Sequence, residues 1–219
     1  QALVIPVVSS SIIYNLRSDC MSSIDTDGML IDKKIIFKRF TSIEHGDLLK
    51  ISGLIVHQTD STSAQHTFNA YNSGGNGAHF LIAKTGEIYQ TASTKKRCYH
   101  VGRRIKSKCL TISPATCDKA AMQKIQAMSW SNKINAIDSH ERAKNYPDRY
   151  PTNSEAIGIE LVGQHVDDKN YEAVTPLQNV SLKWLVKELY NLFSLSSSDV
   201  YRHPDVSYKN PGEASSAAW

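Results

Sequence analysis

The sequence lacks any apolar run long enough to cross a membrane. A membrane-spanning helix needs about 20 consecutive, mostly apolar residues, and no such stretch occurs among the 219 residues. The opening QALVIPVVSSSIIY is apolar, but it contains Pro6 and no basic leader, so it is not typical of a signal peptide. It is more typical of a buried strand or of an arm packed on the body. We therefore expect no stable membrane insertion.

The chain also has little imbalance of charge. It contains 25 Lys and Arg against 21 Asp and Glu, which gives a net charge of +4. So mild and scattered an excess does not favour a nucleic-acid partner, although it is compatible with an anionic polymer. The hydrophobic fraction of 41% is ordinary for a globular protein. The length suits one large domain with embellishments.

Cysteines are few, and none forms a CxxC pair. The spacing of Cys20, Cys98, Cys109 and Cys117 therefore argues against a structural zinc site of the ribbon type. Cys109 and Cys117 bracket LTISPAT, a short loop that a disulfide could close. Such a bridge would imply an oxidising environment. Buried free thiols are the alternative, and the sequence leaves both open.

Three apolar segments predict the strands of a sheet. ISGLIVHQ (51–58) is a short β-rich run typical of a buried strand, and EAIGIELVG (155–163) predicts another. AHFLIAKTGEIYQT (78–91) has two β-like halves separated by Thr85-Gly86, which indicates a hairpin. Residues 1–50 are irregular and carry charge runs. We interpret them as an N-terminal extension with one or two strands, packed on a body of residues 51–219.

Helical signals alternate irregularly with these strands. The clearest lies over 175–193, where Thr175 suits the N-cap and Gln178 completes a capping box. Another helix is predicted after the Ser/Thr-rich start of 61–77. Residues 103–153 are mostly polar and are typical of an insertion with one helix over 118–137. The mixture predicts an α/β fold with a mixed sheet flanked by helices.

Two histidines stand where a metal site is plausible. His57 ends a predicted buried strand, and α/β folds tend to place ligand sites at the carboxyl ends of strands. His203 lies in a loop soon after the long helix. Two histidines from distant segments and one acid are the protein ligands of many catalytic zinc ions. Spacing alone does not establish that the two meet.

Five motifs together resemble those of the zinc-dependent N-acetylmuramoyl-L-alanine amidases, a family that includes peptidoglycan recognition proteins and phage lysins. They are GLIVHQT, GAHFLIAKTGEIYQ, CYHVGRR, SEAIGIELVG and RHPDVSYKNPGEA, in family order. Together they cover residues about 51–91, 98–102 and 155–213. The resemblance implies a mixed sheet with a zinc ion in a surface cleft. It also implies hydrolysis of the amide bond between N-acetylmuramic acid and L-alanine.

The resemblance assigns expected roles to particular residues. His57 and His203 match the two zinc histidines, and Glu160 matches the carboxylate that acts as general base in the bacterial recycling branch. Lys209 resembles the lysine that polarises the scissile carbonyl. His100 matches a histidine lining the substrate cleft. We expect one zinc ion per chain.

One position departs from the family pattern. The third ligand is usually an Asp or Cys directly before Pro-Gly, and here that place holds Asn210, a poor zinc ligand. Glu213 lies ten residues after His203, within the family's usual span, and we predict it as the third ligand. Asp205 and Asn210 itself are the alternatives. Tyr99 is expected to stack on sugar or peptide.

The resemblance leaves several functions open. The leading hypothesis is a zinc amidase acting on peptidoglycan, and the alternative is a non-catalytic module of the same fold that binds muropeptides. The stretch HERAKNYPDRYPTNSEAIGIELVG looks like that in amidases associated with type VI secretion. It suggests an antibacterial effector that is secreted or delivered to the periplasm of a target bacterium, with an immunity protein as a further partner. Oligomeric state and stem-peptide preference stay undetermined.

Overall fold

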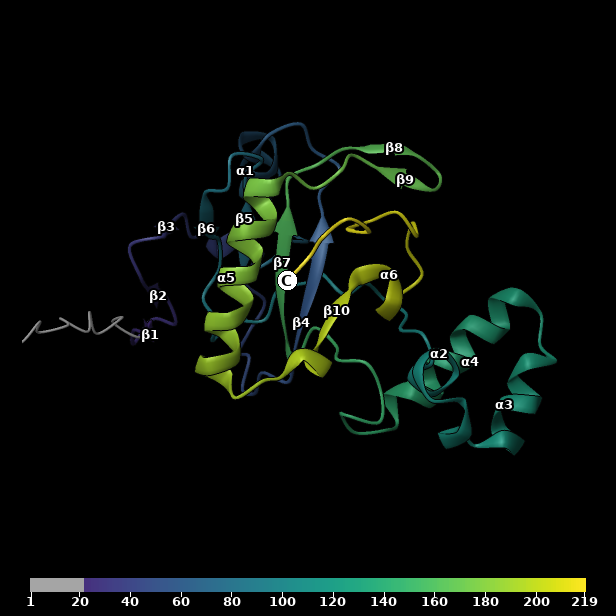
Figure 1. The fold of residues 1–219 in the computed structure, drawn as a ribbon. Coiled ribbons are helices and arrows are strands. Elements are labelled where there is room, and N and C mark those ends of the chain that lie inside the picture. The colour runs from purple at the N-terminus through teal and green to yellow at the C-terminus, as the bar shows by residue number, and fades with distance from the viewer. Residues whose placement is uncertain (1–21) are drawn as a thin grey trace, which may run out of the picture.

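A six-stranded mixed sheet forms the centre of the computed structural model, which describes residues 22–219 (Figure 1). The first four strands in spatial order are parallel, whereas β6 is antiparallel to β5 and β3 is parallel to β6. This arrangement confirms the predicted mixed sheet. The strands in spatial order are β10 (Val200–Arg202), β4 (Gly53–Gln58), β7 (Ala156–Leu161), β5 (Phe80–Ile82), β6 (Ile88–Gln90) and β3 (Ile35–Phe37).

Helix α5 (Pro176–Phe193) packs on one face of the sheet (Figure 1). Its capping box forms as predicted: the Thr175 hydroxyl accepts from the Gln178 backbone N–H at 3.1 Å, and the Gln178 side chain accepts from the Thr175 N–H at 3.0 Å. The apolar stripe of α5 packs on alternate residues of the central strands, which buries the main core. Phe193, the last residue of the helix, packs against this core and is partly buried.

The opposite face of the same strands carries the polar residues. Side chains alternate along a strand, so Val56 faces α5 while His57 points to the other side. His57 and Glu160 are direct partners in the parallel register of β4 and β7. They therefore lie side by side on this face. Helix α1 (Ala64–Asn72), which begins at the cap Ser63, covers part of it.

The N-terminal segment of the described chain packs on the body. A small ribbon forms from β1 (Ser23–Ile24) and β2 (Leu30–Ile31), and η1 (Thr41–Ile43) follows β3. The pairing of β3 with β6 makes this segment the last strand of the central sheet. The strand or arm predicted over residues 1–14 lies outside the described residues.

Residues 103–153 form a helical lobe beside the β10 edge of the sheet (Figure 1). The single helix predicted over 118–137 is wrong, because the chain turns at residues 127–129 and makes two helices whose apolar faces pack together. A disulfide joins Cys109 to Cys117, so of the two alternatives that the sequence left open for this pair, a bridge or free thiols, the bridge is present. The elements are α2 (Lys108–Ile112), η2 (Pro114–Thr116), α3 (Lys119–Gln126) and α4 (Trp130–Arg142).

The two ends of this lobe are fastened to each other. The side-chain oxygen of Asn153 accepts from the backbone N–H of His100 at 3.0 Å and of Val101 at 2.8 Å. Entry and exit of the segment therefore meet at one point beside the sheet. The remaining elements are the hairpin β8 (His165–Asp167) and β9 (Asn170–Tyr171), then η3 (Ser197–Asp199) and α6 (His203–Val206).

Candidate metal centre and active site

Three potential metal ligands converge at the carboxyl ends of β4 and β10. His57 lies near the end of β4, His203 follows β10 directly, and Glu213 comes from the C-terminal loop. The Glu213 Oε1 lies 2.8 Å from Nδ1 of His203 and 3.5 Å from Nδ1 of His57. One donor atom from each residue lies within 4.8 Å of the others, and all three residues are buried. The structure thus brings together the three residues that the sequence predicted as ligands.

Neighbouring groups hold two of these ligands in place. Nε2 of His203 lies 3.1 Å from the Val101 carbonyl, which can only accept, so Nε2 donates to it and Nδ1, which faces Glu213, is the nitrogen that would coordinate a metal. The loop of Glu213 is tied to β4, because the backbone N–H of Ala214 donates to the Gln58 side chain at 3.2 Å. Both interactions aim a donor atom at the same point.

The electrostatics favour the protonation states that bind a metal. Burial, together with the nearby His203, lowers the pKa of His57 to about 4. Burial opposes ionisation of Glu213, but the neighbouring His203 and His57 outweigh it and lower the pKa of Glu213 to about 2. Near neutral pH the site therefore offers a neutral His57 imidazole and a carboxylate.

The donor set fits zinc. Two imidazole nitrogens and one carboxylate oxygen are ligands that Zn²⁺ accepts, and three protein ligands leave one position open for water or substrate. A set of this kind is typical of catalytic rather than structural sites.

Glu160 lies beside this cluster and is held in an unusual state. It is partly exposed to the cleft, yet its Oε2 is buried and has no hydrogen-bond partner among the described residues. Burial raises the pKa of Glu160 to about 8; the charge of Glu213 raises it too, and Lys209 opposes both. A carboxyl group with a pKa near neutrality is able to take up a proton and to release it.

A cleft with a volume of about 1060 Å³ opens onto these residues. The exposed side chains of Lys209 and Tyr99, which the sequence predicts as a catalytic and a substrate-binding residue, line it. The ring of Tyr99 stacks on His45 with centroids 4.0 Å apart and an angle of 5° between the planes. His45, which no sequence pattern singled out, thus supports an aromatic wall of the cleft.

His100 lines the cleft, as the resemblance implies, but its ring is buried and engaged by protein groups. Its neighbour on this wall of the cleft is His57. Its Nδ1 lies 3.0 Å from Nε2 of His57, and its Nε2 lies 3.2 Å from the carbonyl of Ala156. Both ring nitrogens therefore face protein atoms, and neither is left for substrate.

The two alternative third ligands are occupied or placed differently from Glu213. The Asn210 amide donates to the Asp167 carbonyl at 3.0 Å, and its oxygen accepts from the Gly212 N–H at 2.8 Å. Asn210 thereby fastens the C-terminal loop to the β8–β9 hairpin. Asp205 is exposed and lines another cavity.

Two further residues of the cleft were not found from the sequence. Tyr71 of α1 lines it, with a hydroxyl that accepts from the Ala78 N–H at 3.3 Å. Burial raises the pKa of Tyr71 well above its ordinary value, and the charge of Glu160 acts in the same direction. Arg142 reaches the cleft from the end of α4. Only the helical spacing of Phe68 and Tyr71 could have signalled an inward face on α1.

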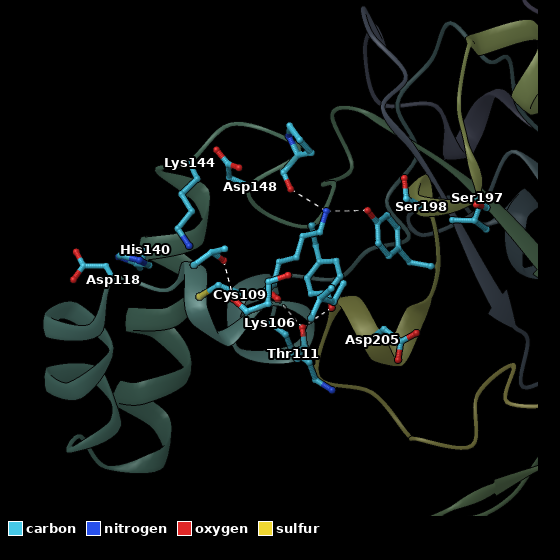
Figure 2. A pocket seen from close by; sticks show the side chains of 18 residues that line it. Lys106, Cys109, Thr111, Asp118, His140, Lys144, Asp148, Ser197, Ser198 and Asp205 are labelled. Atoms are coloured by element: carbon cyan, nitrogen blue, oxygen red, sulfur yellow. Dashed lines mark hydrogen bonds between the residues drawn. The ribbon is translucent and has the colours of Figure 1, made fainter.

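A second cavity of about 1070 Å³ lies between the helical lobe and the β10 edge (Figure 2). Its lysine ammonium groups are already engaged: Lys106 donates to the Pro204 carbonyl, and Lys108 donates to the Pro147 carbonyl and the Tyr201 hydroxyl. None of the clustered metal ligands lines it. The clustered metal ligands therefore line the cleft at His57 and not this second cavity.

A mixed α/β sheet that carries a buried His-His-Glu cluster beside a carboxyl group defines a candidate mononuclear metal hydrolase. The sequence profile of the N-acetylmuramoyl-L-alanine amidase family matches residues 47–214, and the chain belongs to this family. The predicted family, fold class and enzyme class are thus confirmed.

Comparison with curated protein sequences gives no significant match. Among the described residues, no helix combines the length and apolar character of a membrane span.

Several solved structures are similar to this chain. A selenomethionine derivative of AmpD is 18% identical, with a TM-score of 0.47 and coverage of 82% of this chain and 89% of that one. AmpDh3 from Pseudomonas aeruginosa is 17% identical, with a TM-score of 0.47 and coverage of 71% and 51%. AmiD from E. coli is 14% identical, with a TM-score of 0.46 and coverage of 84% and 57%. The match therefore spans about half the length of the AmpDh3 chain.

Proposed function

We propose that this protein is a zinc-dependent amidase that hydrolyses the bond between N-acetylmuramic acid and L-alanine in peptidoglycan. The observation that carries the proposal is the convergence of His57, His203 and Glu213 next to the partly buried Glu160. Membership in the N-acetylmuramoyl-L-alanine amidase family supports the choice of substrate.

His57, His203 and Glu213 would hold the metal, which when bound supplies a Lewis acid and an acidified water molecule. Glu160, the register neighbour of His57, accepts a proton at its carboxylate from the attacking water. The same group then gives this proton to the departing amine nitrogen of L-alanine. The ammonium of Lys209, at the rim of the cleft, stabilises negative charge that develops on the scissile carbonyl oxygen.

Metal analysis and product analysis on matched variants test this proposal. We expect the purified protein to bind one zinc ion per chain and to release free stem peptides from sacculi, with activity lost in chelator. E213A should lose zinc, whereas N210A should keep it, because among residues 22–219 the Asn210 side chain bonds to the backbone of its own loop and of the neighbouring hairpin.

Three results would contradict parts of the proposal. Unchanged zinc content in E213A would reject Glu213 as a ligand. Intact sacculi with zinc bound would reject the amidase activity. Wild-type protein that binds muropeptides but no zinc would favour a non-catalytic recognition module.

We further propose that the protein acts as an antibacterial effector, secreted or delivered to the periplasm of a target bacterium, where an immunity protein would neutralise it. The support is the resemblance of residues 140–163 to amidases associated with type VI secretion. Expression in a host bacterium tests this proposal. Directed to the periplasm the protein should cause lysis that E160Q does not cause, and directed to the cytoplasm it should be tolerated. Equal lysis from both compartments would argue against a wall target.

A further inference from the structure

Each of the two histidine ligands uses its second nitrogen differently. His203 donates to a backbone carbonyl, as already described. His57 instead meets His100, with Nε2 of His57 and Nδ1 of His100 3.0 Å apart and the rings at 88° to each other. An imidazole nitrogen either donates or accepts, so this contact alone does not fix where the hydrogen of His57 resides.

The second ring nitrogen of His100 decides which of the two histidines donates in this contact. Nε2 of His100 lies 3.2 Å from the carbonyl of Ala156, which only accepts. Nε2 of His100 must therefore carry the ring hydrogen, and its Nδ1 is left with a lone pair. His57 then donates from Nε2, and its own Nδ1 turns a lone pair toward Glu213 and the metal position.

A glycine in β7 makes room for the ring that does this. A Cβ added to Gly158 would stand 2.8 Å from Cγ and 2.9 Å from Nδ1 of His100. Contacts this close are sterically forbidden, and the ring could not move without leaving the Ala156 carbonyl or His57. His100 can occupy its position only because residue 158 is a glycine and has no Cβ.

We infer that His100 is a positioning residue that fixes the metal-binding tautomer of His57, and that Gly158 seats it. This inference rests on the proposed function in one respect, namely that His57 binds a metal through Nδ1. It gives a reason for the histidine of CYHVGRR and the glycine of EAIGIELVG that does not involve contact with substrate.

Zinc affinity and the tautomer of His57 test the inference separately. Loss of a hydrogen-bond partner behind a metal ligand typically weakens binding by about 10–100-fold, and we expect this for H100A in competition with a chelator. H100N should recover most of the affinity, because an Asn side-chain oxygen can stand close to the position of Nδ1 and accept from His57. G158A should imitate H100A without removing the imidazole.

V186A is the matched control, since Val186 is buried in α5 on the other face of the sheet and its truncation lowers stability without touching the site. Zinc affinity of V186A should equal that of the wild type. If H100A does not fold, H100N and G158A still carry the comparison.

Nitrogen-15 NMR of the imidazoles in metal-free protein reads the tautomer directly. We expect His57 to carry its hydrogen on Nε2 in the wild type and in H100N, and to become a mixture of tautomers in G158A and H100A. Unchanged tautomer and zinc affinity in H100A and G158A would overturn the inference. A wild type that binds no zinc would defeat the proposed function, while the tautomer measurement would still decide the role of His100.

Discussion

Replacing Glu160 with glutamine should stabilise the metal-free protein while abolishing hydrolysis. The carboxyl group has a buried Oε2 with no hydrogen-bond partner among residues 22–219, and burial raises its pKa from 4.5 to about 8. In the unfolded chain the group ionises near its ordinary value. Between these two pKa values, folding must therefore take up a proton, which becomes harder as the pH rises.

The magnitude follows from the size of this shift. Each pH unit above the ordinary pKa costs about 1.4 kcal/mol until the folded pKa is reached. At pH 7 the free energy of unfolding would fall by about 3 kcal/mol. Because Glu160 is partly exposed to water in the cleft, this figure is an upper limit, and we expect about 1–3 kcal/mol. The stabilising effect of E160Q should grow from pH 5 to pH 8 and then level off.

Urea unfolding of wild type and E160Q in EDTA, at pH 5, 7 and 8.5, measures this difference. E87Q is a useful control, because a hydrogen bond from Thr85 lowers the pKa of the exposed Glu87. This carboxyl group is ionised in both the folded and the unfolded protein above its ordinary pKa, so the stability difference between E87Q and wild type should stay nearly constant over this pH range. A stability difference between E160Q and wild type that does not change with pH would refute the reasoning. It would mean that Glu160 ionises equally in the folded and unfolded protein.

Three other perturbations probe separate parts of the molecule. K209A should retain zinc but lose about 100-fold in kcat, as expected for removal of one group that stabilises an oxyanion; steady-state kinetics on muropeptides measures this. Replacing Cys109 and Cys117 with serine should lower the free energy of unfolding by about 2–3 kcal/mol in urea, with amidase activity retained because the bridge lies in the helical lobe. L185A should cost about 2–5 kcal/mol in the same assay, because Leu185 is fully buried under the sheet.

Features encoded by short-range signals were predictable. The capping box of α5 depends on residues three apart, and the Thr85-Gly86 turn decides the β5–β6 hairpin locally. The candidate ligands were also reachable, since family motifs carry His57 and His203, and Glu213 lies at a suitable distance after the second histidine. Their convergence itself required the parallel pairing of β4 with β10.

Features that depend on long-range pairing were not predictable. β3 is three residues long and mostly exposed, so no periodicity predicts that it completes the sheet. The position of His100 depends on the Ala156 carbonyl, 56 residues away, and on the register that brings Gly158 beneath its ring. The break between α3 and α4 was missed because helix-forming residues continue on both sides of it.

The hydrogen bonds that Asn153 accepts from the backbone of His100 and Val101 bear on how the sequence and length of the helical lobe can vary. One side chain ties together the two ends of residues 103–153. The segment therefore leaves the sheet and returns to it at the same point, as an insertion does. The spacing of His57 and Glu160 is set by strand register and not by the length of that segment. Evolution can therefore lengthen, shorten or rebuild the lobe, and with it the reach of Arg142 into the cleft, while the reactive atoms keep their separation.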